Sequence, residues 1–280
     1  MVRRFSSQFL GMNSAVIYHD GAAHLVDPGV FPKEIVHIKN FLQREQLGKM
    51  TILLTHTHGD HISGWNAFSD HPTYAHISVS TKSQTIRDND VRYLQGMYRK
   101  QGITDIESLT FPVDMHYVNE GELIQRPPTA FLFFHTPGHS IDMSIIVFPE
   151  EKLLVSGDML IQTPLPFILH SILEYWNSLA KIKKLVHEFN VQTHVPGHGK
   201  PASNQDELLK RIVHEQKYLQ KLVLRGKECI LENMTEKKIK EQLASCFPEL
   251  TTLHAHQSNI QTFIREQDRL STDEFRIIPG

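Results

Sequence analysis

Residues 56–61, with the sequence His-Thr-His-Gly-Asp-His, constrain the fold of this chain more than any other segment. They place three imidazoles and a carboxylate directly after the apolar run Met50–Thr55. Such groups are costly to bury unless they share a cation, because each imidazole needs a partner and the carboxylate needs a positive charge. Alternation along an extended segment points the first two imidazoles to one side, and Gly59 lets the backbone turn so that the last two residues face the same cavity. The segment therefore predicts a metal site at the end of a buried strand.

Three later segments also end a predicted strand with a metal-binding type of residue beside glycine. His139 follows an aromatic strand and a Pro-Gly turn, Asp158 follows Gly157, and His198 lies in a Gly-His-Gly turn. The ends of neighbouring strands meet at one edge of a sheet, where catalytic groups converge. Each segment alone is a weak signal, because Pro-Gly turns beside histidine are common. Together, in this order, they predict one site.

Short apolar runs alternate with helical patterns over the first 200 residues. This alternation predicts an α/β fold with strands at residues 15–18, 24–27, 50–55, 115–118, 130–135, 143–148, 152–156 and 191–195, and with helices over residues 32–46 and 173–186. Asp20 and Gly21 form a favoured hairpin dipeptide and predict a turn between the first two strands. Residues 62–104 carry many charges and are expected to form a solvated excursion of helices and loops.

The character of the chain changes after His198. Asn204 and Glu207 have the spacing of a capping box, and the apolar positions that follow predict a long helix. Shorter helices are predicted over residues 235–245 and 256–269. We therefore expect a catalytic domain over residues 1–202 and a helical extension over residues 203–280 that packs on it.

Charge and cysteine content limit the classes of function. The chain has 29 Lys and Arg against 31 Asp and Glu, so its formal net charge is −2 and nucleic acid is not the favoured partner. Cys229 and Cys246 are the only cysteines, which excludes a disulfide framework and a four-thiolate zinc site. The first residues lack the apolar core of a signal peptide, and no uncharged apolar run reaches the roughly 18 residues of a membrane-spanning helix. We expect a cytoplasmic protein without a membrane partner.

These motifs resemble the signature of metallo-β-lactamase-fold hydrolases over about residues 5–200. That signature is an H-x-H-x-D-H loop, a later His after a strand, an Asp in a Gly-Asp turn and a last His in a Gly-His-Gly turn. The resemblance implies a four-layer αββα sandwich, here with a helical C-terminal extension. The metal ligands that it implies are His56, His58, Asp60, His61, His139, Asp158 and His198.

The resemblance also implies how these ligands divide between two ions. One ion would be held by His56, His58 and His139 and the other by Asp60, His61 and His198, with Asp158 bridging. Nitrogen and oxygen ligands without sulfur suit two Zn²⁺ ions, with Fe or Mn as alternatives. Two ions about 3.5–4 Å apart can hold a bridging hydroxide. Asp60 has the implied catalytic role of orienting it and receiving its proton, and Asp27, which matches an early Asp of the pattern, is expected to support a ligand.

The resemblance favours hydrolysis of a small ester, thioester or lactone. Within the family, glyoxalase II enzymes also have a helical C-terminal extension, and quorum-quenching lactonases carry the same H-x-H-x-D-H loop. The main alternative is a mononuclear iron oxygenase of the persulfide dioxygenase type, which would use only His56, His139 and Asp158. A phosphodiesterase is a further alternative. Metal content and oxygen consumption distinguish the hydrolase from the oxygenase.

Residues 162–170 follow the Gly-Asp turn and are apolar apart from one imidazole. Phe167 and His170 are therefore candidate substrate-binding residues in a wall for an acyl or other hydrophobic group, although packing under the C-terminal helices explains the segment equally well. A small-molecule substrate is the expected partner, and the apolar C-terminal helices offer a surface for a homodimer. Residues 62–104, which include Tyr93, have two interpretations, a lid over the site or a plain surface insertion.

The chain contains 18 histidines, and most of those outside the motifs are expected to lie in turns or on solvated faces. This group includes His24, His76 and His256. Two others, His135 and His194, lie in predicted strands close to the site and are candidates for contacts behind the ligands.

Overall fold

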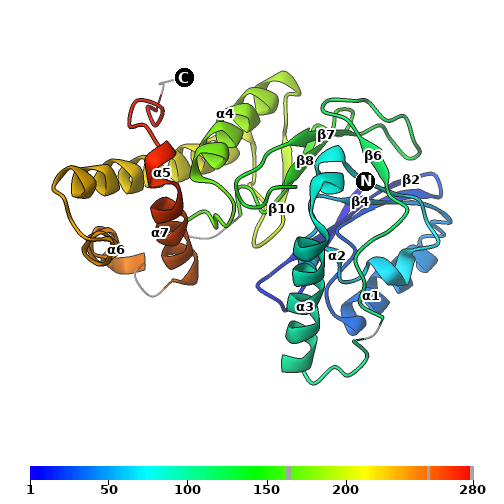
Figure 1. Cartoon of the computed structure of the whole chain (residues 1–280). Coiled ribbons are helices and arrows are strands. Elements are labelled where there is room, and N and C mark those ends of the chain that lie inside the picture. Colours follow the sequence, from blue (N-terminus) through cyan, green and yellow to red (C-terminus); the bar gives the residue numbers. More distant parts are fainter. Residues whose placement is uncertain (107, 162–164, 251–252, 278–280) are drawn as a thin grey trace.

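The computed structural model in Figure 1 describes residues 1–106, 108–161, 165–250 and 253–277, and its centre is a pair of β-sheets. The first sheet has six strands in the order β1-β2-β3-β4-β5-β6, with the bounds Val2–Ser6, Asn13–His19, Ala22–Val26, Lys49–Leu54, Thr73–His76 and His116–Val118. The second sheet has four strands in the order β10-β9-β8-β7. In chain order from β7 their bounds are Leu132–His135, Ser144–Phe148, Leu153–Gly157 and Thr193–Pro196.

The α-helices of the described residues fall into two groups. The first group, α1 to α3, spans Pro32–Arg44, Gly59–Ile62 and Gln84–Lys100. The second group, α4 to α7, spans Ile172–Glu188, Gln205–Leu231, Glu236–Ser245 and His254–Glu266. Short 3₁₀ helices occupy Trp65–Phe68, Ile77–Thr81, Pro248–Leu250 and Gln267–Arg269.

The first sheet changes from antiparallel to parallel pairing after its hairpin. β2 and β3 are antiparallel and turn at Asp20 and Gly21, whose φ angles of 47° and 73° are the left-handed values of a tight hairpin turn. This confirms the predicted turn. β3, β4, β5 and β6 then run parallel, so their carboxyl ends share one edge of the sheet. The motif at residues 56–61 leaves the sheet at this edge.

Three clusters of buried apolar side chains hold the layers together. Between the sheets, Leu53 of the first packs in one cluster with Phe131 at the start of the second. The outer face of the first sheet is covered by α1 and α3, which contribute Ile38 and Leu94. The outer face of the second sheet is covered by α4, through residues such as Leu179. Helices therefore lie on both sides of the paired sheets (Figure 1), which confirms the predicted αββα sandwich.

The expectation that residues 62–104 form a solvated excursion is wrong. The segment contains β5, which pairs between β4 and β6, and α3, which buries Leu94, Met97 and Tyr98 in the cluster under the first sheet. The charges that suggested solvation include Asp88 and Arg92, which lie on the exposed face of α3. β5 has four residues, too few for a periodic pattern to reveal it.

Three histidines expected in turns or on solvated faces, His24, His76 and His256, are buried instead. His24 Nε2 donates to the carbonyl oxygen of Thr129 (2.8 Å), and His76 Nδ1 accepts from the backbone N–H of Ser78 (3.1 Å). Burial lowers the pKa of His24 to about 4, so this imidazole stays neutral. A neutral imidazole can be buried when a ring nitrogen finds a partner, and that partner is not visible in the local sequence.

The C-terminal helices pack on α4. The long helix α5 begins after Asn204, whose Oδ1 accepts from the backbone N–H of Glu207 (2.9 Å) as predicted. Glu207 Oε2 accepts from the backbone N–H of Ser203 (2.8 Å), one residue before the expected capping partner. The helices α4 to α7 share one buried apolar cluster, and the domain boundary after residue 202 stays a prediction. No helix among the described residues is long and apolar enough to cross a membrane.

Candidate metal centre

The motif at residues 56–61 is positioned by β4 and α2. The buried strand β4 delivers His56 to the carboxyl edge of the first sheet, and His58 is the residue before the first turn of α2. Asp60 therefore projects from the start of that helix. A Cβ atom at Gly59 would lie 2.9 Å from the Cβ of Leu94, so glycine is what allows α2 to pass α3 this closely.

The other candidate ligands come from loops of the second sheet. His139 follows β7, while Asp158 and His198 follow β9 and β10, which are parallel neighbours. A Cβ atom at Gly197 would clash with the Asp158 carboxylate, so the glycine lets the loop after β10 close over that side chain. Both sheets thus deliver polar side chains to the same edge of the sandwich.

The structure brings all of the predicted ligand residues together: besides the two groups that the resemblance implied, His56, His61 and Asp158 form a third whose metal-binding atoms lie within 4.8 Å of one another. One group consists of His56, His58 and His139, and the other of Asp60, His61 and His198; the donor atoms of each group lie within 4.8 Å of one another. Asp158 lies between the groups. Its Oδ2 is 3.2 Å from His139 Nε2, and its Oδ1 is 3.1 Å from His61 Nε2. This carboxylate therefore reaches both groups.

The donor atoms fit divalent cations. His56 Nε2 is buried and makes no hydrogen bond within the described part of the chain, and His61 Nε2 and Asp158 Oδ1, buried as well, face each other at 3.1 Å. In addition, His58 Nδ1 lies 2.9 Å from His139 Nε2. Buried polar atoms without hydrogen bonds are rare, and converging nitrogen and oxygen lone pairs are what a bound cation satisfies. A donor set without sulfur suits Zn²⁺, and also Fe or Mn.

Contacts behind the imidazoles fix which ring nitrogen faces the cluster. His61 Nδ1 donates to Asp27 Oδ2 (2.8 Å), which in turn accepts from the Thr55 hydroxyl (2.7 Å). His198 Nδ1 donates to the carbonyl oxygen of Leu10 (3.2 Å). These acceptors keep the proton on Nδ1 of each ring. The lone pair of Nε2 is then free to point into the cluster, where it can bind a metal ion. Asp27 thus has the supporting position that the resemblance implied.

Helix α7 fixes the orientation of His139 indirectly, through the segment that contains Phe167. His139 Nδ1 donates to the carbonyl oxygen of Phe167 (2.7 Å). The buried amide of Asn259 brackets Phe167, because its Oδ1 accepts from the N–H of Ile168 (2.9 Å) and its Nδ2 donates to the carbonyl oxygen of Pro166 (2.8 Å). Sequence reasoning missed Asn259, which is distant in the chain and carries no motif.

Burial and charge separate the protonation states of the imidazoles. Burial lowers the pKa of His58 to about 3 and the pKa of His56 well below its ordinary value, and the neighbouring imidazoles reinforce both shifts. Burial also lowers the pKa of His139. For His61, burial is outweighed by nearby carboxylates, Asp158 first, which raise its pKa well above the ordinary value. The imidazoles of the first group are therefore neutral, which is the form that binds a metal ion. In the second group, a bound cation would displace the proton that His61 carries.

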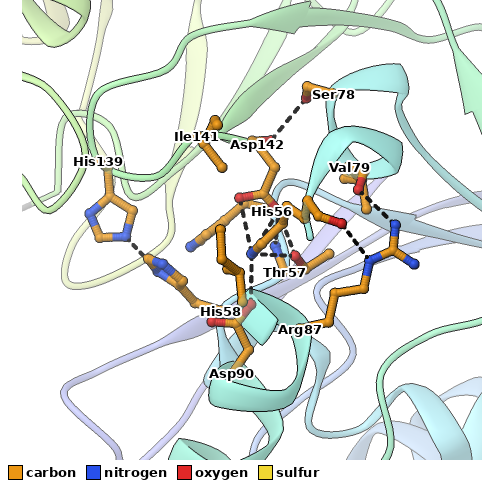
Figure 2. Close-up of polar contacts among 12 residues, drawn as sticks. His56, Thr57, His58, Ser78, Val79, Arg87, Asp90, His139, Ile141 and Asp142 are labelled. Atoms are coloured by element: carbon orange, nitrogen blue, oxygen red, sulfur yellow. Dashed lines mark hydrogen bonds and ion pairs between the residues drawn. The ribbon is translucent and has the colours of Figure 1, made fainter. Parts of the chain in front are cut away.

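A buried charge network braces the residue between the first two histidines (Figure 2). The backbone N–H and hydroxyl of Thr57 both donate to Asp142 Oδ2, at 2.9 and 2.5 Å. Lys82 Nζ donates to the Thr57 hydroxyl (2.8 Å) and to Asp90 Oδ2 (2.7 Å), and it lies 3.3 Å from both oxygens of Asp142. Lys82 outweighs the effect of burial and lowers the pKa of Asp142 to about 2. No local sequence signal marked Lys82 or Asp142.

A cavity of about 600 Å³ opens onto the donor groups. Phe167 lines it, with its ring centre 5.8 Å from that of His139. His170 lies outside the described lining, and its Nε2 is 2.8 Å from Glu174 Oε2. The predicted substrate wall also included residues 162–164, which lie outside the described residues.

A comparison with known proteins identifies the family of this chain. Residues 9–198 match the family profile described as the metallo-beta-lactamase superfamily, and this range contains every predicted ligand. A beta-lactamase-like protein 2 homolog from Drosophila melanogaster is 28% identical over 195 residues, 68% of this chain and 59% of its own length. A hydroxyacylglutathione hydrolase from Francisella tularensis subsp. novicida is 29% identical over 189 residues, 65% of this chain and 62% of its own length. The chain thus spans about three fifths of these relatives.

Solved structures agree on the fold. A metallo-beta-lactamase family protein from Thermus thermophilus superposes with a TM-score of 0.66 at 17% identity, covering 96% of this chain and 95% of its own. A second protein, solved in a di-iron-bound form, gives a TM-score of 0.53 at 22% identity, covering 73% and 96%. The first superposition includes the region of the C-terminal helices.

Proposed function

The chain belongs to the metallo-β-lactamase superfamily, and from this premise we propose that it is a dinuclear metal-dependent hydrolase of a small ester, thioester or lactone. The observation that carries the proposal is the pair of donor groups joined by Asp158, with unsatisfied buried donor atoms, at the base of a cavity. The relative named hydroxyacylglutathione hydrolase supports a thioester among the substrate classes.

Each donor group would hold one cation. The first cation would be held by His56, His58 and His139, the second by Asp60, His61 and His198, with Asp158 contributing an oxygen to each. When bound, two divalent cations lower the pKa of a water molecule to near 7 and polarise a carbonyl oxygen. We propose Zn²⁺ as the native metal because the donors are nitrogen and oxygen, and Fe or Mn would suit them too.

Asp60 is the proposed catalytic carboxylate. It projects from the first turn of α2 into the cavity, and its Oδ2 lies 3.2 Å from His198 Nε2. Burial alone would raise the pKa of Asp60, but the charges of His61 and His198 outweigh burial and lower it. The carboxylate is therefore ionised at neutral pH. It can orient the attacking water and accept its proton, after which the proton passes to the leaving group.

Metal analysis of the purified protein, coupled to a screen of thioester, lactone, β-lactam and phosphodiester substrates, tests the proposal. We expect close to two zinc ions per chain and hydrolysis that a chelator abolishes. Asp60→Asn should retain the fold and lower kcat by at least about 100-fold, the scale of general acid–base catalysis. His37→Ala, on the exposed face of α1, is the control and should behave as wild type. One iron per chain with oxygen consumption would overturn the proposal in favour of an oxygenase.

A further inference from the structure

The rim and walls of the cavity carry apolar side chains from segments that are far apart in the sequence. Leu10 of the N-terminal loop, Tyr93 of α3 and Leu169 before α4 all line it and are 74%, 60% and 39% exposed. Single exposed apolar residues are ordinary, but several that converge on one concavity mark a binding surface. Phe167 and Ala255, from the segment before α4 and from α7, continue this surface inward.

Apart from the two cations proposed for the donor groups, the same surface offers no fixed cation to an anionic substrate. The described lining contains no Lys or Arg, and its carboxylates are Asp60, Asp90 and Asp158. Lys82 contacts Asp90 from behind and is itself buried. Arg265 of α7 donates to the carbonyl oxygen of Leu169 (3.0 Å) and so lies against the back of the wall. A substrate arm with carboxylates or phosphates would lose its hydration there without gaining a counter-charge.

The wall beside the donor groups is held in place before any substrate binds. Phe167 is fixed on one side by its hydrogen bond from His139 and on the other by the amide of Asn259, which contacts both neighbouring peptide groups. An apolar group packed on this ring would lie next to the first donor group. A preformed apolar wall with a few polar groups at one end is the usual form of a small-molecule site.

We propose that the cavity binds the acyl chain of an uncharged aliphatic ester or thioester and presents its carbonyl to the donor groups. This inference rests on the proposed function. A water molecule adds to the acyl carbon, the bond from that carbon to the ester oxygen or thioester sulfur breaks, and the leaving atom takes a proton. The products are a fatty acid and an alcohol or thiol. The substrate is thereby distinguished from a glutathione thioester, whose tripeptide carries carboxylates.

A chain-length series tests the proposal. N-acetylcysteamine thioesters from acetyl to octanoyl would be assayed with the zinc-loaded full chain, beside glutathione thioesters of the same acyl groups. Each buried methylene contributes about 0.8 kcal/mol, so kcat/KM should rise by up to about fourfold per methylene until the cavity is filled. A flat series, or a preference of tenfold or more for the glutathione thioesters, would overturn the proposal while leaving the hydrolase assignment intact.

Aspartate substitutions on the rim test whether the preference for longer acyl chains arises at this surface. Leu169→Asp and Tyr93→Asp should each lower the octanoyl-to-acetyl ratio of kcat/KM by at least about tenfold, because they place a carboxylate beside the chain. Leu224→Asp is the matched control, since Leu224 on α5 is also 39% exposed but lies outside the described lining of the cavity. Equal ratios in Leu169→Asp, Tyr93→Asp and Leu224→Asp would contradict the proposed surface.

Binding separates the two proposals if no thioester in the series, and no ester or lactone assayed beside it, is hydrolysed. That result refutes the proposed function, and octanamide and acetamide then serve as uncharged probes in calorimetric titrations of the zinc-loaded protein. Octanamide binding at least tenfold tighter than acetamide, and lost in Leu169→Asp, supports the acyl-chain surface. Absence of octanamide binding overturns it.

Discussion

Replacement of Asn259 by alanine should loosen the metal site through helix α7. The amide is fully buried and holds Pro166 and Ile168 through hydrogen bonds of 2.8 and 2.9 Å. Between these residues, the Phe167 carbonyl accepts the Nδ1–H of His139. Asn259→Ala removes both hydrogen bonds, and a third from Nδ2 to the Tyr218 hydroxyl (3.0 Å), so the segment that orients His139 loses these attachments to α7.

The two hydrogen bonds to the peptide groups of Pro166 and Ile168 set the expected magnitude, because the Tyr218 hydroxyl keeps His256 as a partner. Each leaves a buried peptide group without its partner, at a cost of about 1–3 kcal/mol, and relaxation of the segment recovers part of that. We expect a loss of about 3 kcal/mol in the free energy of unfolding, which lowers the Tm of a chain of this size by roughly 5 °C. Loss of a supporting contact to a ligand should weaken zinc binding by about 10- to 100-fold.

Thermal unfolding of the metal-free chain and zinc competition with a chromophoric chelator measure the two effects separately. Asn177→Ala, an exposed asparagine on α4, is the control and should change neither. Thr262→Val is a milder perturbation of the same segment, since the Thr262 hydroxyl donates to the Ile168 carbonyl (3.1 Å), and it keeps the test valid if Asn259→Ala does not fold. A variant that melts earlier yet binds zinc with wild-type affinity would refute the positioning of His139 through Phe167.

Three further outcomes can be measured on the same protein. Lys82→Met should lower the free energy of unfolding in urea by about 3–5 kcal/mol, because it leaves the Asp142 carboxylate buried without its cation, and adding Asp142→Asn should recover part of the loss. Glu215 of α5 is buried and accepts from the Tyr175 hydroxyl (2.9 Å), and burial raises its pKa from 4.5 to about 8. Its contribution to stability is therefore complete below pH 4.5 and is lost as the pH rises through 8, so urea midpoints of Glu215→Gln should fall less than those of wild type over that range, and an equal slope in both proteins would contradict the assignment. Zinc at 100 times its Kd should stabilise the metal-free chain by about 2.7 kcal/mol, and an unchanged Tm would argue against a site in the folded chain.

Features that depend on neighbouring residues were predicted well. The turn at Asp20 and Gly21 and the start of α5 after Asn204 follow from local backbone and capping preferences, and the structure confirms both. The αββα sandwich was implied by the family resemblance that the ligand motifs carry, and the structure confirms it as well. The short strands β1 and β5 were missed, because pairing along a sheet edge, rather than any pattern in so few residues, makes them strands.

Polar residues whose partners are distant in the chain were not predicted. His24 was expected on a solvated face but is buried against the Thr129 carbonyl, more than a hundred residues away. Lys82 and Asp142 meet beside Thr57 only because the loop after β4, the segment before α3 and the loop before β8 converge. The charge of a side chain determines how much its burial costs. The fold determines which distant residue offsets that cost.

The sequence by itself therefore determined the type of fold and the residues that present donor atoms, since strand periodicity, glycine turns and ligand spacing are all encoded over a few positions. The tertiary structure alone decided which nitrogen of His61, His198 and His139 faces the cluster, because Asp27, Leu10 and Phe167 hold the opposite nitrogen. It also decided the character of the cavity, whose apolar rim is assembled from the N-terminal loop, α3, the segment before α4 and α7. These properties arise from contacts between distant segments, and such contacts exist only once the layers have packed.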